Sequence, residues 1–238
     1  MKICVVTPRF AVAGVPLAQL RFARALANLG HTVHLVVGYV DPQFSFPEVN
    51  NVRVQLWTQQ RVRGMFLPFL RYLKMEKPDV VFSAEDHLNA IVLLAALCSG
   101  SKAKVSCSSR VTPFDTYSDV PLTKRWILKQ LMHALTWRAD AMTCVSKDMV
   151  VQYQSVFTGS PHICVYNIVD DKLSRLKMYE PVEHVWFECR NVPVLVAAGR
   201  LAAWKGFGDL IHAMKILTQS RPARLLILGD GPLRTELQ

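Results

Sequence analysis

KICVVTPRFAVAGVPLAQLRFARALANLGHTVHLVV, residues 2–37, begins and ends with short apolar runs rich in β-branched residues. The runs Lys2–Thr7 and Thr32–Val37 are typical of strands that are buried on both faces. Between them, apolar side chains recur with the spacing of one helix face, at Ala18, Phe22, Ala25, Leu26 and Leu29. Gly30 follows, where glycine commonly ends a helix. A strand, a crossover helix and a second strand predict a parallel βαβ unit.

The same alternation continues to about residue 170. Further strands are predicted at Val52–Trp57, Asp79–Ser83, Lys104–Cys107, Ala141–Val145 and Ile163–Tyr166. Helices are predicted between them, near residues 66–76, 87–98, 122–138 and 146–157. This order predicts the α/β class, with an open, doubly wound parallel sheet of the Rossmann-like kind.

A second α/β unit is predicted after a polar stretch. Residues 171–191 are mixed in composition and flanked by helix breakers, which is typical of a linker. Beyond them the sequence predicts a strand at Val194–Ala198, a helix at Gly208–Ser220 and a strand at Arg224–Leu228. We expect one Rossmann-like domain over residues 1–170 and, over residues 192–238, the start of a second one that is incomplete.

The composition predicts a globular chain, because 51% of the 238 residues are hydrophobic and 19% are charged. The longest nearly uncharged apolar stretch, Leu88–Cys98, is shorter than the roughly 18 to 20 residues of a membrane span. The first ten residues lack the apolar region of a signal peptide. We therefore expect a cytoplasmic protein.

The cysteines and histidines do not form a metal-binding pattern. No CxxC pair occurs, and His31 and His34 have no third ligand nearby, so we expect reduced, mostly buried thiols. The six cysteines are Cys4, Cys98, Cys107, Cys144, Cys164 and Cys189.

The net charge of +10 favours anionic partners such as nucleotides or phospholipid surfaces. Because no helix-turn-helix, zinc or RNP-like pattern and no charged tail occurs, nucleic-acid binding is not expected. RVRGMFLPFLRYLKMEK, residues 61–77, interleaves five basic residues with apolar ones. Either this segment docks on an anionic membrane surface, or it is a core-facing helix with a solvated basic side whose pattern Pro68 interrupts.

Two turns that follow predicted strands contain glycine. PRFAVAGVP, residues 8–16, has Gly14 but no GxGxxG pattern, which counts against a dinucleotide site. A loop before a helix N-terminus suits an anionic or hydroxyl-rich ligand, although an ordinary βα turn explains it equally well. LLILGDGPLRTEL, residues 225–237, predicts a strand, a glycine turn that lets the backbone approach a ligand, and a helix with Pro232 at its first position. No P-loop lysine follows this turn.

A third turn, GRLAAWKGF at residues 199–207, places Arg200 and Lys205 at the carboxyl edge of a sheet. The guanidinium and the ammonium group could hold a diphosphate and stabilise the charge of a leaving group. The alternative is that both side chains are solvated surface charges.

Taken together, these motifs resemble the family 4 glycosyltransferases. The resemblance is carried by the opening strand and glycine loop, CVSKDMVVQY (144–153), VYNIVD (165–170), AAGRLAAWKGFGDLIHAM (197–214) and LLILGDGPLRTEL. It implies a GT-B fold of two Rossmann-like domains and the transfer, with retention, of a sugar from a UDP- or GDP-linked donor. It also implies that Arg200 and Lys205 contact the donor diphosphate and act in catalysis, and that the loop around Gly14 lies near the sugar and the acceptor.

Segment SCSSRVTP (106–113) looks most like transferases that build bacterial surface polysaccharides such as lipopolysaccharide. We therefore expect a glycan or lipid-linked acceptor and a position at the inner face of the plasma membrane. The implied chemistry stabilises a departing phosphate and positions a hydroxyl, so no metal or other cofactor is expected.

The chain departs from the family pattern in three places. First, the E-x7-E motif and the strands that hold the base would lie beyond residue 238. Second, the first loop has one glycine, and Ser109 and Arg110 occupy positions where a histidine is common in the family. Third, Ile168 replaces a glycine. These departures leave three alternatives open, namely an inactive remnant, an acceptor-binding protein and a sugar-nucleotide epimerase.

The remaining candidates follow predicted strands of the first domain. His87 could contact sugar or phosphate, or simply begin a helix, and Arg110 is expected on the acceptor side because it follows a central strand. Asp115 and Asp119 are either acceptor contacts or solvated loop acids.

Overall fold

A computed structural model describes residues 1–11, 13–168, 172–188 and 191–238. Its contacts divide the chain into two units, Met1–Lys172 and Leu173–Gln238. The expected linker, residues 171–191, is for the most part grouped with the second unit, and Cys189 lies outside the described residues.

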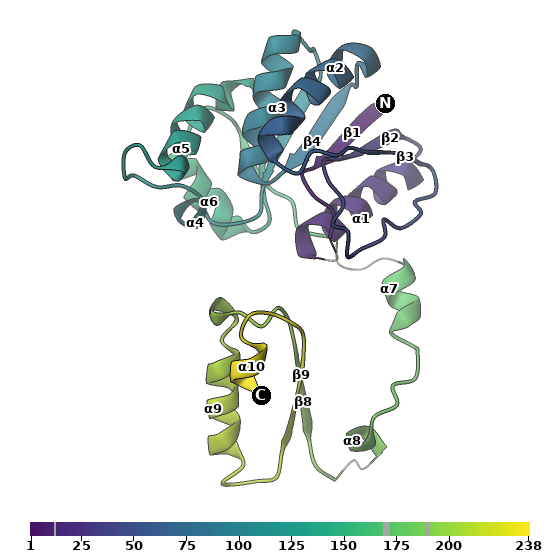
Figure 1. Cartoon of the computed structure of the whole chain (residues 1–238), viewed down its shortest axis with the longest axis vertical. Helices are drawn as coiled ribbons and strands as arrows, with labels where there is room; N and C mark the ends of the chain where they lie inside the picture. The colour runs from purple at the N-terminus through teal and green to yellow at the C-terminus, as the bar shows by residue number, and fades with distance from the viewer. Residues whose placement is uncertain (12, 169–171, 189–190) are drawn as a thin grey trace. The chain divides into compact units, whose positions relative to one another are not determined.

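The first unit contains a seven-stranded parallel sheet with the order β3-β2-β1-β4-β5-β6-β7 (Figure 1). This confirms the predicted α/β class. The strands are β1 Lys2–Thr7, β2 Thr32–Val37, β3 Val52–Leu56, β4 Val80–Ala84, β5 Lys104–Ser109, β6 Ala141–Cys144 and β7 His162–Cys164. The α-helices are α1 Gly14–Asn28, α2 Phe66–Glu76, α3 Asp86–Ser99, α4 Pro113–Thr116, α5 Lys124–Leu135 and α6 Lys147–Val156, with short 3-10 turns at Val62–Met65 and Thr136–Arg138.

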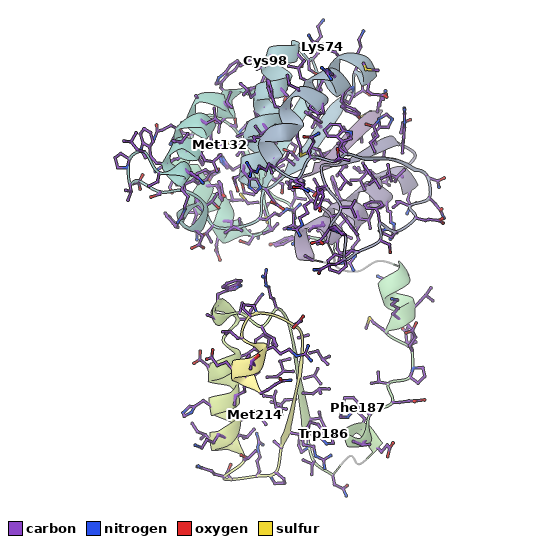
Figure 2. The ribbon with its side chains drawn as sticks, viewed as in Figure 1. Lys74, Cys98, Met132, Trp186, Phe187 and Met214 are labelled. Carbon is purple, nitrogen blue, oxygen red and sulfur yellow. The ribbon has the colours of Figure 1, made fainter. Side chains whose placement is uncertain are left out.

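The helices bury the two faces of the sheet unequally. Helix α1 covers β1 to β3 on one face with a small apolar cluster that includes Leu20, Ala23 and Leu35. Helices α2, α3, α5 and α6 bury the other face in a larger cluster, where Met132 of α5 is fully buried (Figure 2). The side of the sheet that carries α1 is therefore less covered over β4 to β7, and this is where the pocket described below lies.

Helix α2 shows where the apolar residues of the segment 61–77 lie. Phe69, Tyr72 and Leu73 are buried in the larger cluster, so the apolar stripe faces the core. Pro68 does not interrupt the helix, because it lies in the first turn, where no intrahelical N–H bond is required. Lys74 lies on the exposed side of the helix (Figure 2).

A polar group is buried where α2 meets the sheet. His34 is 3% exposed, and its Nδ1 lies 2.9 Å from the hydroxyl of Tyr72. The carboxylate of Glu76 accepts a hydrogen bond from Lys2 and pairs with Arg53 at 3.2 Å. Nδ1 of His34 lies 3.9 Å from the same carboxylate, so His34, a residue of β2, has a structural role.

His34 also links the stability of the chain to pH. Burial lowers the pKa of His34 from the ordinary 6.5, so the folded chain keeps the imidazole neutral where the unfolded chain binds a proton. The unfolding free energy should therefore be highest above about pH 6.5 and fall as the pH drops below it. We expect the urea midpoint to fall between about pH 7.5 and about pH 5.5, and to fall less in His34→Asn.

Burial lowers the pKa values of His133 and His162 in the same direction, so the variant isolates the share that belongs to His34. The asparagine amide can occupy the place of Nδ1 beside Tyr72. An identical pH dependence in His34→Asn and in the natural chain would contradict the assignment.

The second unit is built on two parallel strands, β8 Val194–Ala198 and β9 Arg224–Leu228, connected through α9 Phe207–Leu217. Met214 of α9 is buried beside them (Figure 2). The segment expected as a linker forms α7 Lys172–Lys177 and α8 Val185–Glu188. The guanidinium of Arg224 in β9 lies 5.4 Å from the ring centre of Trp186 in α8, within the range of a cation–π contact.

One expectation about the second unit needs correction. Helix α10 spans Arg234–Leu237, so Pro232 is not its first residue; the Leu233 N–H donates to the carbonyl of Leu201 at 3.1 Å and keeps the preceding residues in a turn. The five described cysteines are all free and three of them, Cys4, Cys107 and Cys144, are buried, in agreement with the expected reduced and mostly buried thiols; Cys164 is half-buried and Cys98 is exposed.

Candidate functional site

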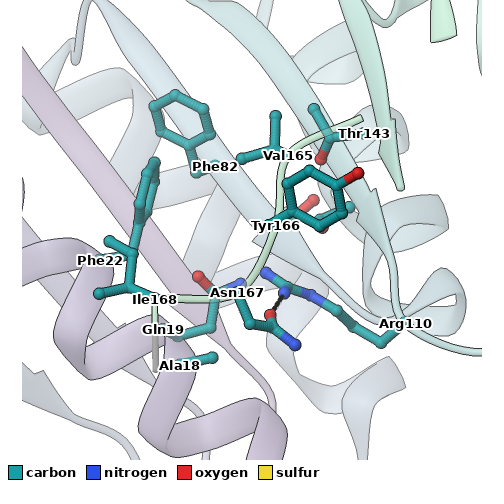
Figure 3. A pocket seen from close by; sticks show the side chains of 12 residues that line it. Ala18, Gln19, Phe22, Phe82, Arg110, Thr143, Val165, Tyr166, Asn167 and Ile168 are labelled. Atoms are coloured by element: carbon teal, nitrogen blue, oxygen red, sulfur yellow. Dashed lines mark hydrogen bonds between the residues drawn. The ribbon is translucent and has the colours of Figure 1, made fainter. Parts of the chain in front are cut away.

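The carboxyl ends of the first unit's strands meet at one edge of the sheet, and the strand order reverses between β1 and β4. Open α/β sheets bind ligands at such a point, because the adjoining loops run in opposite directions. A pocket with a cavity of about 40 Å³ lies there (Figure 3). It is lined by Ala18, Gln19, Phe22, Phe82, Ser83, Ser108, Arg110, Thr143, Val165, Tyr166, Asn167 and Ile168.

Arg110 supplies the positive charge of this pocket. Its guanidinium donates through Nη1 to Oδ1 of Asn167, which lies 57 residues away in the sequence (Figure 3). Its Nε is buried and makes no hydrogen bond within the described chain. Burial lowers the pKa of Arg110, and the carboxylate of Glu85 opposes that shift. A partly desolvated guanidinium with a free N–H suits an oxygen-rich ligand.

The pocket combines aromatic and polar walls. Phe22 of α1 and Phe82 of β4 meet edge to face, with ring centres 4.9 Å apart. Gln19 and Thr143 are buried polar residues of the lining. Aromatic faces beside hydrogen-bonding groups are typical of sites for small polar ligands.

Asp86 lies behind the strand ends and is 4% exposed. Its Oδ1 accepts hydrogen bonds from the Ser109 hydroxyl at 2.8 Å and the Tyr117 hydroxyl at 2.7 Å. Its Oδ2 lies 3.2 Å from the hydroxyl of Tyr153. Burial raises the pKa of Asp86, and the three hydroxyl contacts oppose that shift. We call Asp86, Ser109, Tyr117 and Tyr153 the Asp86 network.

His87 follows Asp86 but does not line the pocket. Its Nε2 lies 3.2 Å from Oε2 of Glu85, and this contact raises the pKa of His87. Glu85 has φ +79°, a left-handed conformation that costs a non-glycine residue on the order of 1–3 kcal/mol. The backbone is thus turned sharply between β4 and α3, and the side chain of His87 is half-exposed.

Gly14 is the first residue of α1 and also lies outside the pocket lining. A side chain at this position would meet no atom within 4 Å, so the glycine is not required by close packing. The next turns of the same helix supply Ala18, Gln19 and Phe22 to the pocket.

The acidic loop candidates make local contacts. Asp115 accepts a hydrogen bond from the Thr112 hydroxyl at 2.7 Å, and Asp119 pairs with Lys129 at 2.5 Å. Asp119 and Lys129 line a second, polar hollow of about 490 Å³ beside α4 and α5.

In the second unit, Arg200 and Lys205 lie in the loop that joins β8 to α9. Arg200 follows β8 by two residues, and Lys205 ends a 3-10 turn, Ala203–Lys205, just before α9. Both side chains are exposed, and in the described part of the chain neither forms an ion pair. Two cations free of carboxylate partners stand near the N-terminus of an eleven-residue helix, an arrangement that favours anions.

The two glycines of the Gly229-Asp230-Gly231 turn allow it to pack closely against the loop that joins β8 to α9. A Cβ on Gly229 would lie 1.9 Å from the carbonyl oxygen of Gly199, and one on Gly231 would lie 2.4 Å from that of Leu201. The Leu201 N–H donates to the Asp230 carbonyl at 3.0 Å. The glycine turn was expected to let the backbone approach a ligand. In this structure, the backbone of residues 229–231 instead approaches that of residues 199–201.

Sequence reasoning placed Arg110 at the correct edge but missed its partners. Asn167 was noticed only within the motif VYNIVD, and Gln19 only as part of a helical segment. The buried carboxylate of Asp86 carried no signal beyond its place after a strand. Among the described residues, no set of three His, Cys, Asp or Glu side chains is arranged to hold a metal ion.

Three kinds of comparison with known proteins bear on this site. The family described as "Glycosyl transferase 4-like domain" matches residues 13–166, which include every residue of the first pocket except Asn167 and Ile168. An uncharacterized glycosyltransferase of Methanocaldococcus jannaschii is 26% identical in an alignment of 213 positions that covers 80% of this chain and 51% of that protein. This chain therefore spans about half the length of that relative.

Solved structures of glycosyltransferases share the fold. The Anabaena protein HepE, in complex with UDP and glucose, has a TM-score of 0.67 at 16% identity, covering 99% of this chain and 63% of its own. The lipopolysaccharide outer core galactosyltransferase WaaB has a TM-score of 0.60 at 15% identity, covering 100% and 63%. The sucrose-phosphate synthase of Thermosynechococcus elongatus has a TM-score of 0.67 at 13% identity, covering 95% and 61%. These likenesses support the expected GT-B fold. Within the described ranges, no helix is both long and apolar enough to span a membrane.

Proposed function

The chain belongs to the glycosyl transferase 4-like domain family, and on this premise we propose that it is a glycosyltransferase that moves a sugar from a nucleotide-sugar donor to a glycan or lipid-linked acceptor. Because the chain spans 51% of its archaeal relative and 63% of HepE, the activity itself is part of the proposal. HepE is known in complexes with UDP and UDP-glucose, which supports a nucleotide-sugar donor. WaaB acts on the lipopolysaccharide outer core, which supports a role in bacterial surface glycans.

The observation that carries the proposal is that Arg200 and Lys205, in the loop after β8, have no carboxylate partner among the described residues. We assign the donor diphosphate to Arg200 and Lys205, with UDP or GDP as the nucleotide. Arginine can bond two phosphate oxygens at once, and lysine supplies a mobile point charge. The backbone N–H groups at the start of α9 add partial positive charge beside them.

The proposed chemistry is electrostatic. As the bond between the sugar and the diphosphate breaks, negative charge grows on the leaving phosphate oxygen, and Arg200 and Lys205 stabilise it. The acceptor hydroxyl oxygen forms the new bond to the same sugar carbon and gives its proton to the departing phosphate oxygen, with retention of configuration as the family resemblance implies. Holding the hydroxyl in place lowers the entropic part of the barrier.

We assign the acceptor to the carboxyl edge of the first unit. The pocket that contains Arg110 offers a cation, amide groups and three aromatic rings, which suit a sugar or a phosphorylated group. Gly14 and His87 lie on the same edge, outside the pocket, and we keep them as acceptor-side candidates. The exposed side of α2, with Leu67, Arg71 and Lys74, is the surface that we propose to lie on an anionic membrane.

Calorimetric titration of the 238-residue chain with UDP and GDP tests the donor assignment. We expect saturable binding of one nucleotide, weakened about 10- to 100-fold by Arg200→Ala and by Lys205→Ala, because each loses a charged hydrogen bond of about 1.5–3 kcal/mol. The matched control is Arg221→Ala, an exposed arginine of the same unit that lies outside the loop, and it should bind as the natural chain does.

Equal affinity in the two loop variants would contradict the roles of Arg200 and Lys205. Absence of binding to either nucleotide would contradict donor binding by this chain and would favour an acceptor-binding protein or an inactive remnant.

A further inference from the structure

We propose that Asp86 is a positioning residue that holds Arg110 in the pocket by hydrogen bonds. The role of Arg110 toward an acceptor rests on the proposed function, but its position in the structure does not. Asp86 does not line the pocket, so it would act only through its neighbours.

The Asp86 network holds the chain on both sides of Arg110. Ser109, the residue before Arg110, donates its hydroxyl hydrogen to the Asp86 carboxylate at 2.8 Å. Val111, the residue after it, has its carbonyl oxygen 3.0 Å from the hydroxyl of Tyr153, which also lies 3.2 Å from Oδ2 of Asp86. These two acceptors share the single hydroxyl hydrogen of Tyr153. Arg110 thus extends into the pocket from a backbone segment that is fixed at both ends.

The network connects elements that are distant in the sequence. Asp86 begins α3, Ser109 ends β5, Tyr117 follows α4 and Tyr153 belongs to α6. Tyr117 is 4% exposed and Tyr153 is fully buried, and both rings pack on Phe157. The donors are therefore held rigidly, and the carboxylate is the shared acceptor that orients them.

Stability alone gives a weak reason for a carboxylate at this place. A buried charge loses hydration, and three neutral hydroxyl groups compensate for that loss here; no lysine or arginine pairs with Asp86 in the described chain. Apolar residues of similar volume are often as stabilising as buried polar groups. The buried carboxylate of Asp86 is explained if its role is to fix the geometry of residues 109–111.

The Nε–H signal of Arg110 in ¹⁵N NMR spectra reports this position directly. The signal is assigned from its absence in Arg110→Lys. Because Nε is buried in the natural chain, its proton should exchange slowly with water. In Asp86→Ala we expect exchange about tenfold faster or loss of the signal, whereas in Asp86→Asn we expect exchange within about twofold of the natural rate. The asparagine oxygen can still accept from Ser109 and Tyr117, and its amide can donate to the oxygen of Tyr153.

The control is Tyr72→Phe, which removes another buried hydroxyl contact, that to His34, without touching the network. It should leave the Arg110 signal unchanged whatever it does to stability. If Asp86→Ala does not fold, Ser109→Ala and Tyr153→Phe replace it, since each removes one tie and keeps the carboxylate. Faster exchange in either variant supports the proposal.

An unchanged Arg110 signal in folded Asp86→Ala, or in both replacement variants, would overturn the proposal. The proposal would also be overturned if the Arg110 Nε–H signal were lost in Asp86→Asn to the same extent as in Asp86→Ala. The charge of Asp86, and not its hydrogen bonds, would then hold the segment. The readout needs neither donor nor acceptor, so a failure of the proposed function would appear in the nucleotide titration and not in this experiment.

Discussion

Replacement of Gly229 by alanine should destabilise the second unit by about 3 kcal/mol and abolish nucleotide binding. The added Cβ would lie 1.9 Å from the carbonyl oxygen of Gly199, and neither atom belongs to a flexible side chain. The turn at residues 229–231 must then move away from residues 199–201, which breaks the Gly199 N–H bond to Leu228 at 2.9 Å. Because Arg200 lies in the displaced turn, the proposed diphosphate site should be lost with it.

Hydrogen exchange measured by mass spectrometry checks this result segment by segment. Peptides that cover β8 and β9 should exchange much faster in Gly229→Ala, while those of β1 should be unchanged, since β1 belongs to the other unit. Retention of normal protection in β8 would show that the two turns can separate without cost.

Gly208→Ala is the matched control for this substitution. Gly208 lies in the first turn of α9, and a Cβ there would meet no atom within 4 Å. Alanine is the better helix former by about 0.5–1 kcal/mol, so protection of the second unit should be equal or higher. Destabilisation by both substitutions would mean that the close contact at Gly229 is not the cause.

Phe69→Ala should lower the unfolding free energy of the first unit by about 3–5 kcal/mol. Phe69 is 1% exposed, stacks on Tyr72 with ring centres 5.6 Å apart, and lies 6.3 Å from the ring of Trp57. Truncation leaves a cavity between α2 and the sheet, where rigid neighbours cannot fill it. Urea unfolding followed by far-ultraviolet circular dichroism measures the loss.

Leu67→Ala is the control on the exposed side of the same helix. Leu67 is 59% exposed, so the variant should change stability by less than about 0.5 kcal/mol. The same variant tests the proposed membrane surface, because less of it should sediment with phosphatidylserine vesicles than of the natural chain. A stability loss at Leu67 equal to that at Phe69 would contradict the assignment of the buried and exposed sides of α2.

Local sequence patterns were sufficient for most of the elements. The apolar runs of β1 and β2, the helical spacing between them and the periodicity of α2 were predicted from residues 2–37 and 61–77, and the structure contains each one. Predictions at helix starts were less reliable. Pro232 was misplaced because the Leu233 N–H bonds to Leu201, a partner that the local sequence does not identify.

The candidate site likewise has parts that the sequence predicts and parts that it does not. The motif around Arg200 and Lys205 was recognisable because its residues are neighbours in one turn. The bond between Arg110 and Asn167 joins residues 57 positions apart, and it exists because β5 and the segment after β7 leave the same edge of the sheet. Strand order, and not the sequence of either segment, brings these two side chains together.

What the amino-acid sequence determined by itself was the alternation of strands and helices, the α/β class and the family, because periodicity and short motifs are properties of adjacent residues. Only the tertiary structure decided that Asp86 is buried among hydroxyl groups, that Gly229 faces the carbonyl of Gly199, and that the apolar side of α2 faces the core. Each of these depends on which distant segments pack together. Burial and close contact are set by strand order and register, which local patterns do not contain.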